Sequence, residues 1–433
     1  MTSSRRTIDV RTLARVEGEG ALNIEMDGDQ ATSVELRLFE PPRLFEAFLR
    51  GRSALEVPDL TARICGICPV AYQMSSCAAI EDALGVTVDP PLRTLRRLLY
   101  CGEWIESHAL HVFMLHAPDF LGYDDAFAMA RDHGDMVRRG LAIKQVGNAI
   151  VSCLGGRAIH PVNVCVGGFY RVPTRDELTA LAPGIDDALA AAHAGLAWAG
   201  GFEFPQLERD YELVALRDEH AYPFCDGRIA STGGIDIAAS ELDTCFVEEQ
   251  VPYSTALHAR VRARGAYLTG PLARFALNAD RLGTEAAAAA RSVALVAPCR
   301  NPSRSILVRL VEIIQALDEA RSIIATYARP DRPSVPVSLR AGVGHGCTEA
   351  PRGLLYHRYI LDEQGLITDA RIVPPTSQNQ KTIEDDLRAI AGTLASLPHE
   401  EATLLAERAV RNHDPCISCS THFLDLRIAG GPR

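Results

Sequence analysis

Two short cysteine motifs stand near opposite ends of this 433-residue chain and constrain its fold more than any other feature. The first is RICGICPV, with Cys65 and Cys68, and the second is DPCISC, with Cys416 and Cys419. Two cysteines at this spacing can bind one metal ion, and soft thiolates favour zinc, nickel or iron over hard cations. If all four bind one ion, the fold must bring both ends of the chain together.

Spacing alone leaves three kinds of site open. Two CxxC pairs are typical of structural zinc, although the pairs of a zinc ribbon usually lie close together in the sequence. A redox-active or catalytic metal buried at the centre of a domain fits the wide separation better. A redox disulfide within one pair is the third possibility, but neither pair follows a clear strand of a βαβ pattern.

The composition indicates a globular protein without a broad basic surface. The chain is 47% hydrophobic, which is ample for a sizeable core. Its formal net charge of -11 argues against binding to nucleic acid or anionic membranes, because either needs a basic face. No apolar stretch approaches the roughly 18 uninterrupted residues of a membrane span. We expect no nucleic-acid partner and no membrane span.

The N-terminal residues predict a cytoplasmic protein. Arg5 and Arg6 are followed by IDVRTLARVEG, where an export signal would have an apolar core. In a reducing compartment the 12 cysteines are thiols or metal ligands more often than structural disulfides.

The hydrophobic patterns predict a mainly α fold with small peripheral β elements. Alternating apolar residues flank a DGD turn over residues 21–39, and a second pair of alternating segments spans 353–375. Helical periods dominate between and after them. The expected helices are 44–50, 69–84, 91–115, 124–151, 175–199, 283–297, 303–327 and 382–396. We find no repeat or linker, so residues 1–433 are expected to form one domain, with 1–42 as an N-terminal β-hairpin region.

The two cysteine motifs and five further motifs resemble the large catalytic subunit of nickel-iron hydrogenases. The further motifs follow the order of that family and are RVEGEG at 15–20, RLFEAFLRGR at 43–52, SHALHVFMLHAPD at 107–119, EAPRG at 349–353 and PTSQN at 375–379. The resemblance implies a fold built around a central helix bundle. It covers nearly the whole chain, although 170–300 carries no motif.

The resemblance implies a nickel-iron centre. Cys65, Cys68, Cys416 and Cys419 would hold nickel, and Cys68 and Cys419 would also bridge to an iron that carries carbon monoxide and cyanide. Four thiolates make nickel electron-rich, while the diatomic ligands keep iron low-spin and leave an open bridging position. Dihydrogen would be cleaved heterolytically, with the proton passing to a base.

Glu17 in RVEGEG matches the family's proton-relaying glutamate, although a salt-bridged glutamate at the start of a strand is the simpler interpretation. Arg352 in EAPRG matches an arginine above the open position, where with Pro351, Asp119 and Asp414 it would form a canopy of ordered groups. Without the family, Asp119 could simply cap a helix.

Four other positions match residues that surround the centre in the family. Thr376 would donate a hydrogen bond to a cyanide, although PTSQN could be a surface turn. Glu46, His422 and the backbone carbonyl of Gln380 match the ligands of a magnesium ion, for which imidazole is a less usual ligand. His108 and His111 could suggest a separate metal site, but we expect them to pack near the centre.

The residues that follow the second cysteine motif are expected to be removed. The family's large subunits are made with a C-terminal extension that a dedicated protease removes after nickel insertion, so residues 423–433 are expected to be cleaved, with a maturation chaperone assisting. The alternative is that FLDLRI is a terminal strand that stays.

Tyr72 stands where the family usually has a histidine that supports a bridging thiolate.

The chain looks most like the cytoplasmic bidirectional hydrogenases and sulfhydrogenases, which couple dihydrogen to NAD or NADP. It has no GxGxxG after a strand and no cysteine set for an iron-sulfur cluster. Electrons are therefore expected to leave through an iron-sulfur small subunit and then subunits with FAD or FMN.

Other classes remain open at this point. A dihydrogen sensor would keep the four cysteines, and a zinc-stabilised interaction protein would need nothing more. The quinone-side subunit of respiratory complex I shares the fold but lacks these cysteines.

Overall fold

The computed structural model describes residues 5–41 and 44–422, and its N-terminal part is an antiparallel sheet. Strands β2 (Gly20–Asp27) and β3 (Gln30–Leu38) form the predicted hairpin, in which alternate residues are buried. The prediction missed β1 (Arg5–Val10), which pairs with β2, because its alternation is too short to stand out.

The helices account for most of the remaining regular structure, so the chain is mainly α with small sheets. Their bounds are α1 (Phe45–Leu49), α2 (Val57–Thr61), α3 (Pro69–Leu84), α4 (Pro90–Ala109), α5 (Ala117–Leu121), α6 (Ala126–Gly155), α7 (Arg175–Thr179), α8 (Ala182–Gly200), α9 (Leu242–Cys245), α10 (Pro271–Asn278), α11 (Thr284–Ser292), α12 (Ser305–Thr326), α13 (Pro375–Ala389), α14 (Ala391–Ser396), α15 (His399–Arg411) and α16 (Ile417–Ser420).

Four predicted helices differ from the structure, and one of them, expected over 283–297, already ends at Ser292. The helix expected over 175–199 is broken into α7 and α8, and the one expected over 91–115 continues from α4 into a π-helical turn, Leu110–His116. The helix expected to begin at 382 begins at Pro375, because proline suits the first turn of a helix. PTSQN is therefore the start of a helix and not a surface turn.

Short antiparallel sheets complete the fold. The two-stranded ones are β4 (Val164–Cys165) with β5 (Gly168–Phe169), and β9 (Phe246–Gln250) with β10 (Leu257–Val261). The three-stranded ones are β6 (Val214–Arg217), β7 (Arg228–Ser231) and β8 (Asp236–Ile237), and β11 (Gly342–Ala350), β12 (Gly353–Leu361) and β13 (Ile367–Val373). The predicted β12–β13 hairpin is confirmed, whereas β11 and the strands between 214 and 261 were not predicted.

Glycines in β11 allow this strand to lie directly on α3. A Cβ at Gly344 would overlap the carbonyl oxygen of Ala79, and one at Gly346 would overlap that of Ser75. Only glycine permits such a close approach of two backbones. Because Cys68 immediately precedes α3, this contact also fixes one pair of cysteines.

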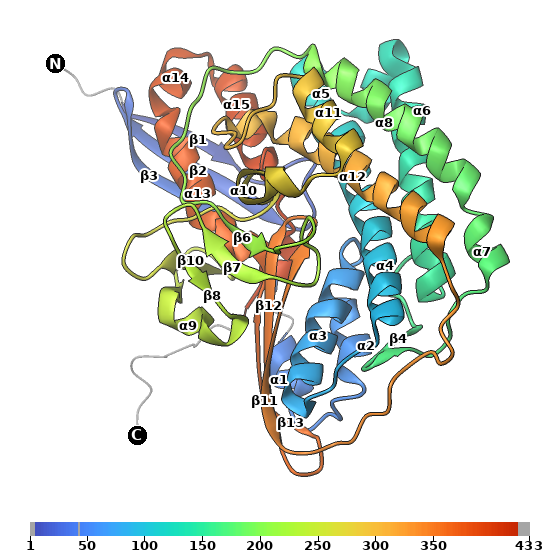
Figure 1. Ribbon diagram of the computed structural model, residues 1–433. Coiled ribbons are helices and arrows are strands. Elements are labelled where there is room, and N and C mark those ends of the chain that lie inside the picture. Colours follow the sequence, from blue (N-terminus) through green and yellow to red (C-terminus); the bar gives the residue numbers. More distant parts are fainter. Residues whose placement is uncertain (1–4, 42–43, 423–433) are drawn as a thin grey trace, which may run out of the picture.

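Two packed regions flank the β11–β13 sheet in Figure 1. On one side the long helices α4, α6, α8 and α12 pack against one another. On the other side the N-terminal sheet is covered by α13, α14 and α15, so that the first and last parts of the chain share a core. Among the helices of residues 5–41 and 44–422, none is both long and apolar enough to cross a bilayer.

Candidate metal centre

Four buried thiols from both ends of the chain meet in one cluster. Their sulfur atoms all lie within 4.8 Å of one another. The Cys65 and Cys416 sulfurs are 3.6 Å apart, as are those of Cys68 and Cys419, and those of Cys416 and Cys419 are 2.7 Å apart. Within the described parts of the chain this is the one group of His, Cys, Asp and Glu side chains with such geometry. The predicted convergence of the two motifs is confirmed.

The segment around Glu17 holds the C-terminal cysteines in place. The Ile417 N–H donates to the Glu17 carbonyl over 2.9 Å, and a parallel bridge joins Glu17 to Cys416. The residue after Glu17 must be a glycine, because the φ of Gly18 is 87° and a Cβ at this position would lie 2.7 Å from the Cβ of Ile417. The Glu17 carboxylate accepts from the Cys416 thiol over 3.0 Å and from the Ser418 N–H over 3.1 Å.

The electrostatics of the cluster suit a cation that binds thiolates. Burial opposes ionisation, but hydrogen bonds with the other three cysteines hold the pKa of Cys65 well below its usual value. Burial raises the pKa of Cys416 well above its usual value and that of Cys419 to about 11. A divalent cation among the four sulfurs would favour the thiolates. The purely sulfur donor set fits a soft or borderline metal such as nickel, iron or zinc.

Arg352 and Asp414 form a buried pair of opposite charges. The Arg352 Nε donates to the Asp414 carbonyl over 2.8 Å, and Nη2 donates to the Asp414 carboxylate over 3.1 Å. Asp414 and the thiols raise the pKa of Arg352 against the effect of burial, so the guanidinium stays charged. Its Nη1 is buried and has no hydrogen-bond partner in the described chain. It can therefore donate to a bound group.

Asp119 is connected to this pair through Arg411. Its carboxylate accepts from Arg411 Nε and Nη2, both over 2.8 Å, and also pairs with Arg15. Although burial opposes ionisation, these arginines lower the pKa of Asp119. Arg411 links Asp119 to the pair, because its carbonyl accepts from the Asp414 N–H over 3.1 Å, whereas Asp119 makes no hydrogen bond to Arg352 within the described chain.

Thr376 and Pro351 both lie in the walls of the site. The Thr376 hydroxyl accepts from the Cys416 N–H over 2.9 Å, so its own proton remains available to another acceptor. The Pro351 carbonyl accepts from Arg274 over 2.9 Å. Both residues are buried.

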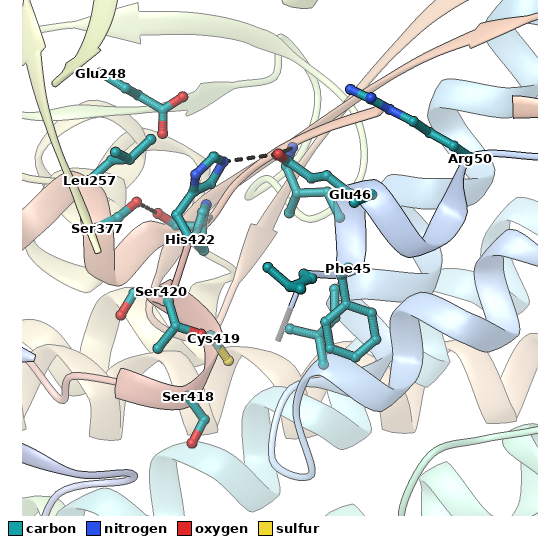
Figure 2. Close-up of a pocket in the computed structure, with 16 residues that line it drawn as sticks. Phe45, Glu46, Arg50, Glu248, Leu257, Ser377, Ser418, Cys419, Ser420 and His422 are labelled. Atoms are coloured by element: carbon teal, nitrogen blue, oxygen red, sulfur yellow. Dashed lines mark hydrogen bonds and ion pairs between the residues drawn. The ribbon is translucent and has the colours of Figure 1, made fainter. Parts of the chain in front are cut away.

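Glu46 and His422 face each other in a cavity of about 300 Å³ next to Cys419 (Figure 2). The His422 Nε2 lies 2.9 Å from the Glu46 carboxylate, which also accepts from the Ile372 N–H over 2.7 Å. Gln380, whose backbone carbonyl is the third predicted ligand, is not among the residues that line the cavity. Its side chain donates to the Leu36 carbonyl and to the hydroxyl of Ser254, the neighbour of Thr255, whose carbonyl accepts from the His422 N–H.

Tyr72 lies against Cys419, as its position in the motif suggests. Its hydroxyl donates to the Cys419 carbonyl over 3.5 Å, a long hydrogen bond, and no bond from it to a thiol is formed. Its ring lies 5.7 Å from that of His357. Burial raises the pKa of Tyr72 well above its usual value, so the phenol stays protonated.

Sequence reasoning missed a fully buried ionic cluster behind the site. Arg274 in α10 pairs with Glu312 in α12 and with Glu349 in β11. A clue was present, because LTGPLARFALN places one arginine in an otherwise apolar helix, where a buried charge needs a partner. His108 packs against this cluster, with its Nε2 2.9 Å from the Glu312 carboxylate.

Comparison with known proteins identifies relatives across nearly the whole chain. Residues 43–137 and 269–422 match the family described as nickel-dependent hydrogenase. The sulfhydrogenase 2 subunit alpha of Pyrococcus furiosus is 34% identical over 97% of this chain and 100% of that protein. The NAD-reducing hydrogenase HoxS subunit beta of Cupriavidus necator is 26% identical over 97% of this chain and 95% of its own.

A solved structure extends the comparison to three dimensions. It is a crystal structure of an NAD+-reducing [NiFe]-hydrogenase in the H2-reduced state. The two chains superpose with a TM-score of 0.87 at 28% identity, covering 97% of this chain and 100% of the other. The four cysteines of the centre lie within the matched ranges.

Proposed function

The chain belongs to the nickel-dependent hydrogenase family, as the catalytic subunit of a hydrogenase, and we propose that it cleaves dihydrogen reversibly and exchanges the electrons with NAD or NADP through partner subunits. The observation that carries the proposal is the buried cluster of four thiols, flanked by Glu17 on one side and Arg352 on the other. The named relatives support the link to a nicotinamide.

The thiol cluster would hold the metals. Cys65, Cys68, Cys416 and Cys419 would bind nickel, and Cys68 and Cys419 would share their sulfurs with an iron that carries carbon monoxide and cyanide. This centre supplies the Lewis acidity and the electron storage that heterolysis of dihydrogen needs. A zinc site is not favoured, because the matched family is nickel-dependent.

Glu17 would take the proton away from the centre. Its carboxylate contacts the Cys416 sulfur directly, and the Ser418 N–H fixes its orientation. A carboxylate held this close to a proton donor can act as a general base. Because Glu17 is only partly buried, it can pass the proton outward.

Arg352 and Asp414 would form the canopy above the open position. The free Nη1 of Arg352 is a preorganised donor in a site without bulk water, where such a group stabilises developing charge most. Pro351 and Asp119 would complete the canopy, Asp119 through Arg411. The Thr376 hydroxyl would donate to a cyanide.

Glu46 and His422 would bind magnesium in the cavity beside Cys419. Their side chains already face each other, and the cavity leaves room for water, which magnesium retains. The backbone carbonyl of Gln380 would be the third ligand, as the resemblance implies.

We further propose how the subunit is built and where it works. The α4, α6, α8 and α12 helices would form the central bundle of one domain that spans the chain, with residues 1–42 as its N-terminal β region. A maturation chaperone and a protease would act on residues 423–433, which lie outside the described residues. The mature subunit would work in the cytoplasm with an iron-sulfur small subunit and flavin-containing subunits that react with NAD or NADP.

Dihydrogen uptake by the purified complex tests the proposed function. We expect dihydrogen-dependent reduction of a viologen dye, and of NAD or NADP when the flavin-containing subunits are present. The Cys416→Ser variant should lose nickel and all turnover, whereas Cys299→Ala, a buried cysteine away from the cluster, should keep both. Binding of nickel without catalytic turnover would indicate a sensor and contradict the proposal.

A further inference from the structure

Arg274 uses a bidentate ion pair to anchor itself in the core. Its Nε and Nη2 donate to the two carboxylate oxygens of Glu312, both over 2.8 Å, and both side chains are 0% exposed. Arg274 lowers the pKa of Glu312 to about 2 against the effect of burial, so the pair is fully charged. A pair of this kind fixes both the position and the plane of the guanidinium.

The other donors of Arg274 reach the backbone directly before Arg352. Nη1 donates to the Ala350 carbonyl over 2.9 Å and to the Glu349 carboxylate over 3.0 Å, and Nη2 donates to the Pro351 carbonyl over 2.9 Å. All five N–H groups of the guanidinium are thereby used. Arg274 binds the two peptide groups that lead into Arg352.

The same segment of chain holds the backbone on the far side of Arg352. The Leu354 N–H donates to the Thr269 hydroxyl over 2.8 Å. A Cβ at Gly270 would lie 2.7 Å from the Arg352 carbonyl oxygen, so the two backbones are in close contact. Residues 269–274 therefore hold the turn on both sides of Arg352.

Aromatic and polar side chains brace the ionic pair from behind. The Tyr222 hydroxyl donates to Glu312 over 2.8 Å, and the His108 Nε2 lies 2.9 Å from its other oxygen. The Trp104 ring lies 4.2 Å from the Arg274 guanidinium carbon. All N–H groups of Arg274 and both carboxylate oxygens of Glu312 have partners, which makes the ion pair rigid.

We propose that Arg274, held by Glu312, is a positioning residue that sets the place of Arg352 above the metal centre. Arg274 donates all its N–H groups inside the protein, so it acts through Arg352 and not on the reacting atoms. The side chain of Arg352 itself is tied only to Asp414 in the described structure, so its placement depends on a fixed backbone. The role in catalysis rests on the proposed function.

A double-mutant cycle tests this role through turnover. Arg274→Lys keeps the charge but loses the planar fork, so we expect about a tenfold loss of turnover with nickel and iron content unchanged. The Arg352→Lys variant alone should lose turnover by at least about a hundredfold. The double variant should turn over as Arg352→Lys does, because Arg274 has nothing left to position. Losses that multiply in the double variant would overturn the proposal.

Amide hydrogen exchange provides a test that needs no metal. In metal-free protein, Arg274→Lys should speed exchange of the backbone amides at 349–354 several-fold, and so should Glu312→Gln, which keeps the shape but weakens the anchor. Arg260→Lys changes a partly exposed arginine paired with Glu249 and should leave these amides unchanged. Unchanged exchange in both anchor variants would overturn the positioning role. Absence of nickel or of turnover from the unmutated protein would instead overturn the proposed function.

Discussion

Glu17 lies at the centre although its motif is far from both cysteine pairs in the sequence. The motifs, each with a distinctive local pattern, led to residues next to the cluster: Glu17 contacts the Cys416 sulfur, Thr376 contacts the Cys416 amide, and Arg352 pairs with Asp414, two residues before Cys416. Arg274 was missed because its role depends on a partner in a distant helix.

Replacing the Glu17 carboxylate should separate proton transfer from metal binding. Glu17→Gln keeps an acceptor for the Ser418 N–H but cannot carry a proton, so we expect unchanged nickel content and a loss of turnover of at least about 100-fold. Metal analysis measures the nickel content, and dye reduction and exchange between dihydrogen and deuterated water measure turnover and proton transfer. Glu19→Gln, an exposed neighbour in the same motif, should be neutral. Normal turnover in Glu17→Gln would remove it from the relay.

The elements that were predicted best are those with a strong local period. The two hairpins and the long helices appear close to their expected positions, since alternation and helical spacing are visible in one stretch of sequence. Strands β6 to β10 are short, and their burial comes from neighbours elsewhere, so no local pattern marked them. Strand β11 was missed because its glycines, which serve the contact with α3, weaken its strand pattern.

The glycine contact between β11 and α3 should be sensitive to one added methyl group. Gly344→Ala would push the strand off the Ala79 carbonyl, so we expect unfolding to become easier by at least about 2 kcal/mol. The displaced helix should also bind less nickel through Cys68. Urea denaturation and metal analysis measure both effects. Gly392→Ala, with its nearest atom at 3.7 Å, is the control, and equal stability of the two variants would show that the contact is not tight.

At the scale of the whole molecule, we expect acid to destabilise the fold, because a buried imidazole is neutral in the folded protein. His357 lies between α3 and the β11–β13 sheet, and burial lowers its pKa to about 3 from an ordinary 6.5. Below pH 6.5 the unfolded chain therefore binds a proton that the folded protein does not. The stability from the neutral imidazole is complete above pH 6.5 and falls as the pH drops toward 3.

The expected size of this effect is about 2 kcal/mol between pH 6.5 and 5, at about 1.4 kcal/mol per pH unit. The His357→Gln variant should lose that part of the pH dependence, measured as free energy of unfolding in urea at several pH values. His399→Gln, an exposed histidine, should keep the slope of the parent protein. A His357→Gln variant with an unchanged slope would contradict the assignment.

The spacing of the residues alone predicted one long-range contact, the meeting of the two cysteine motifs, because a four-thiolate site requires it. The most direct test of the account is the infrared spectrum of the protein purified from its native host, in the region where metal-bound carbon monoxide and cyanide absorb. We expect bands from both ligands, with one nickel per chain. A spectrum without them from nickel-loaded, mature protein would contradict the assignment of the four cysteines to a nickel-iron centre.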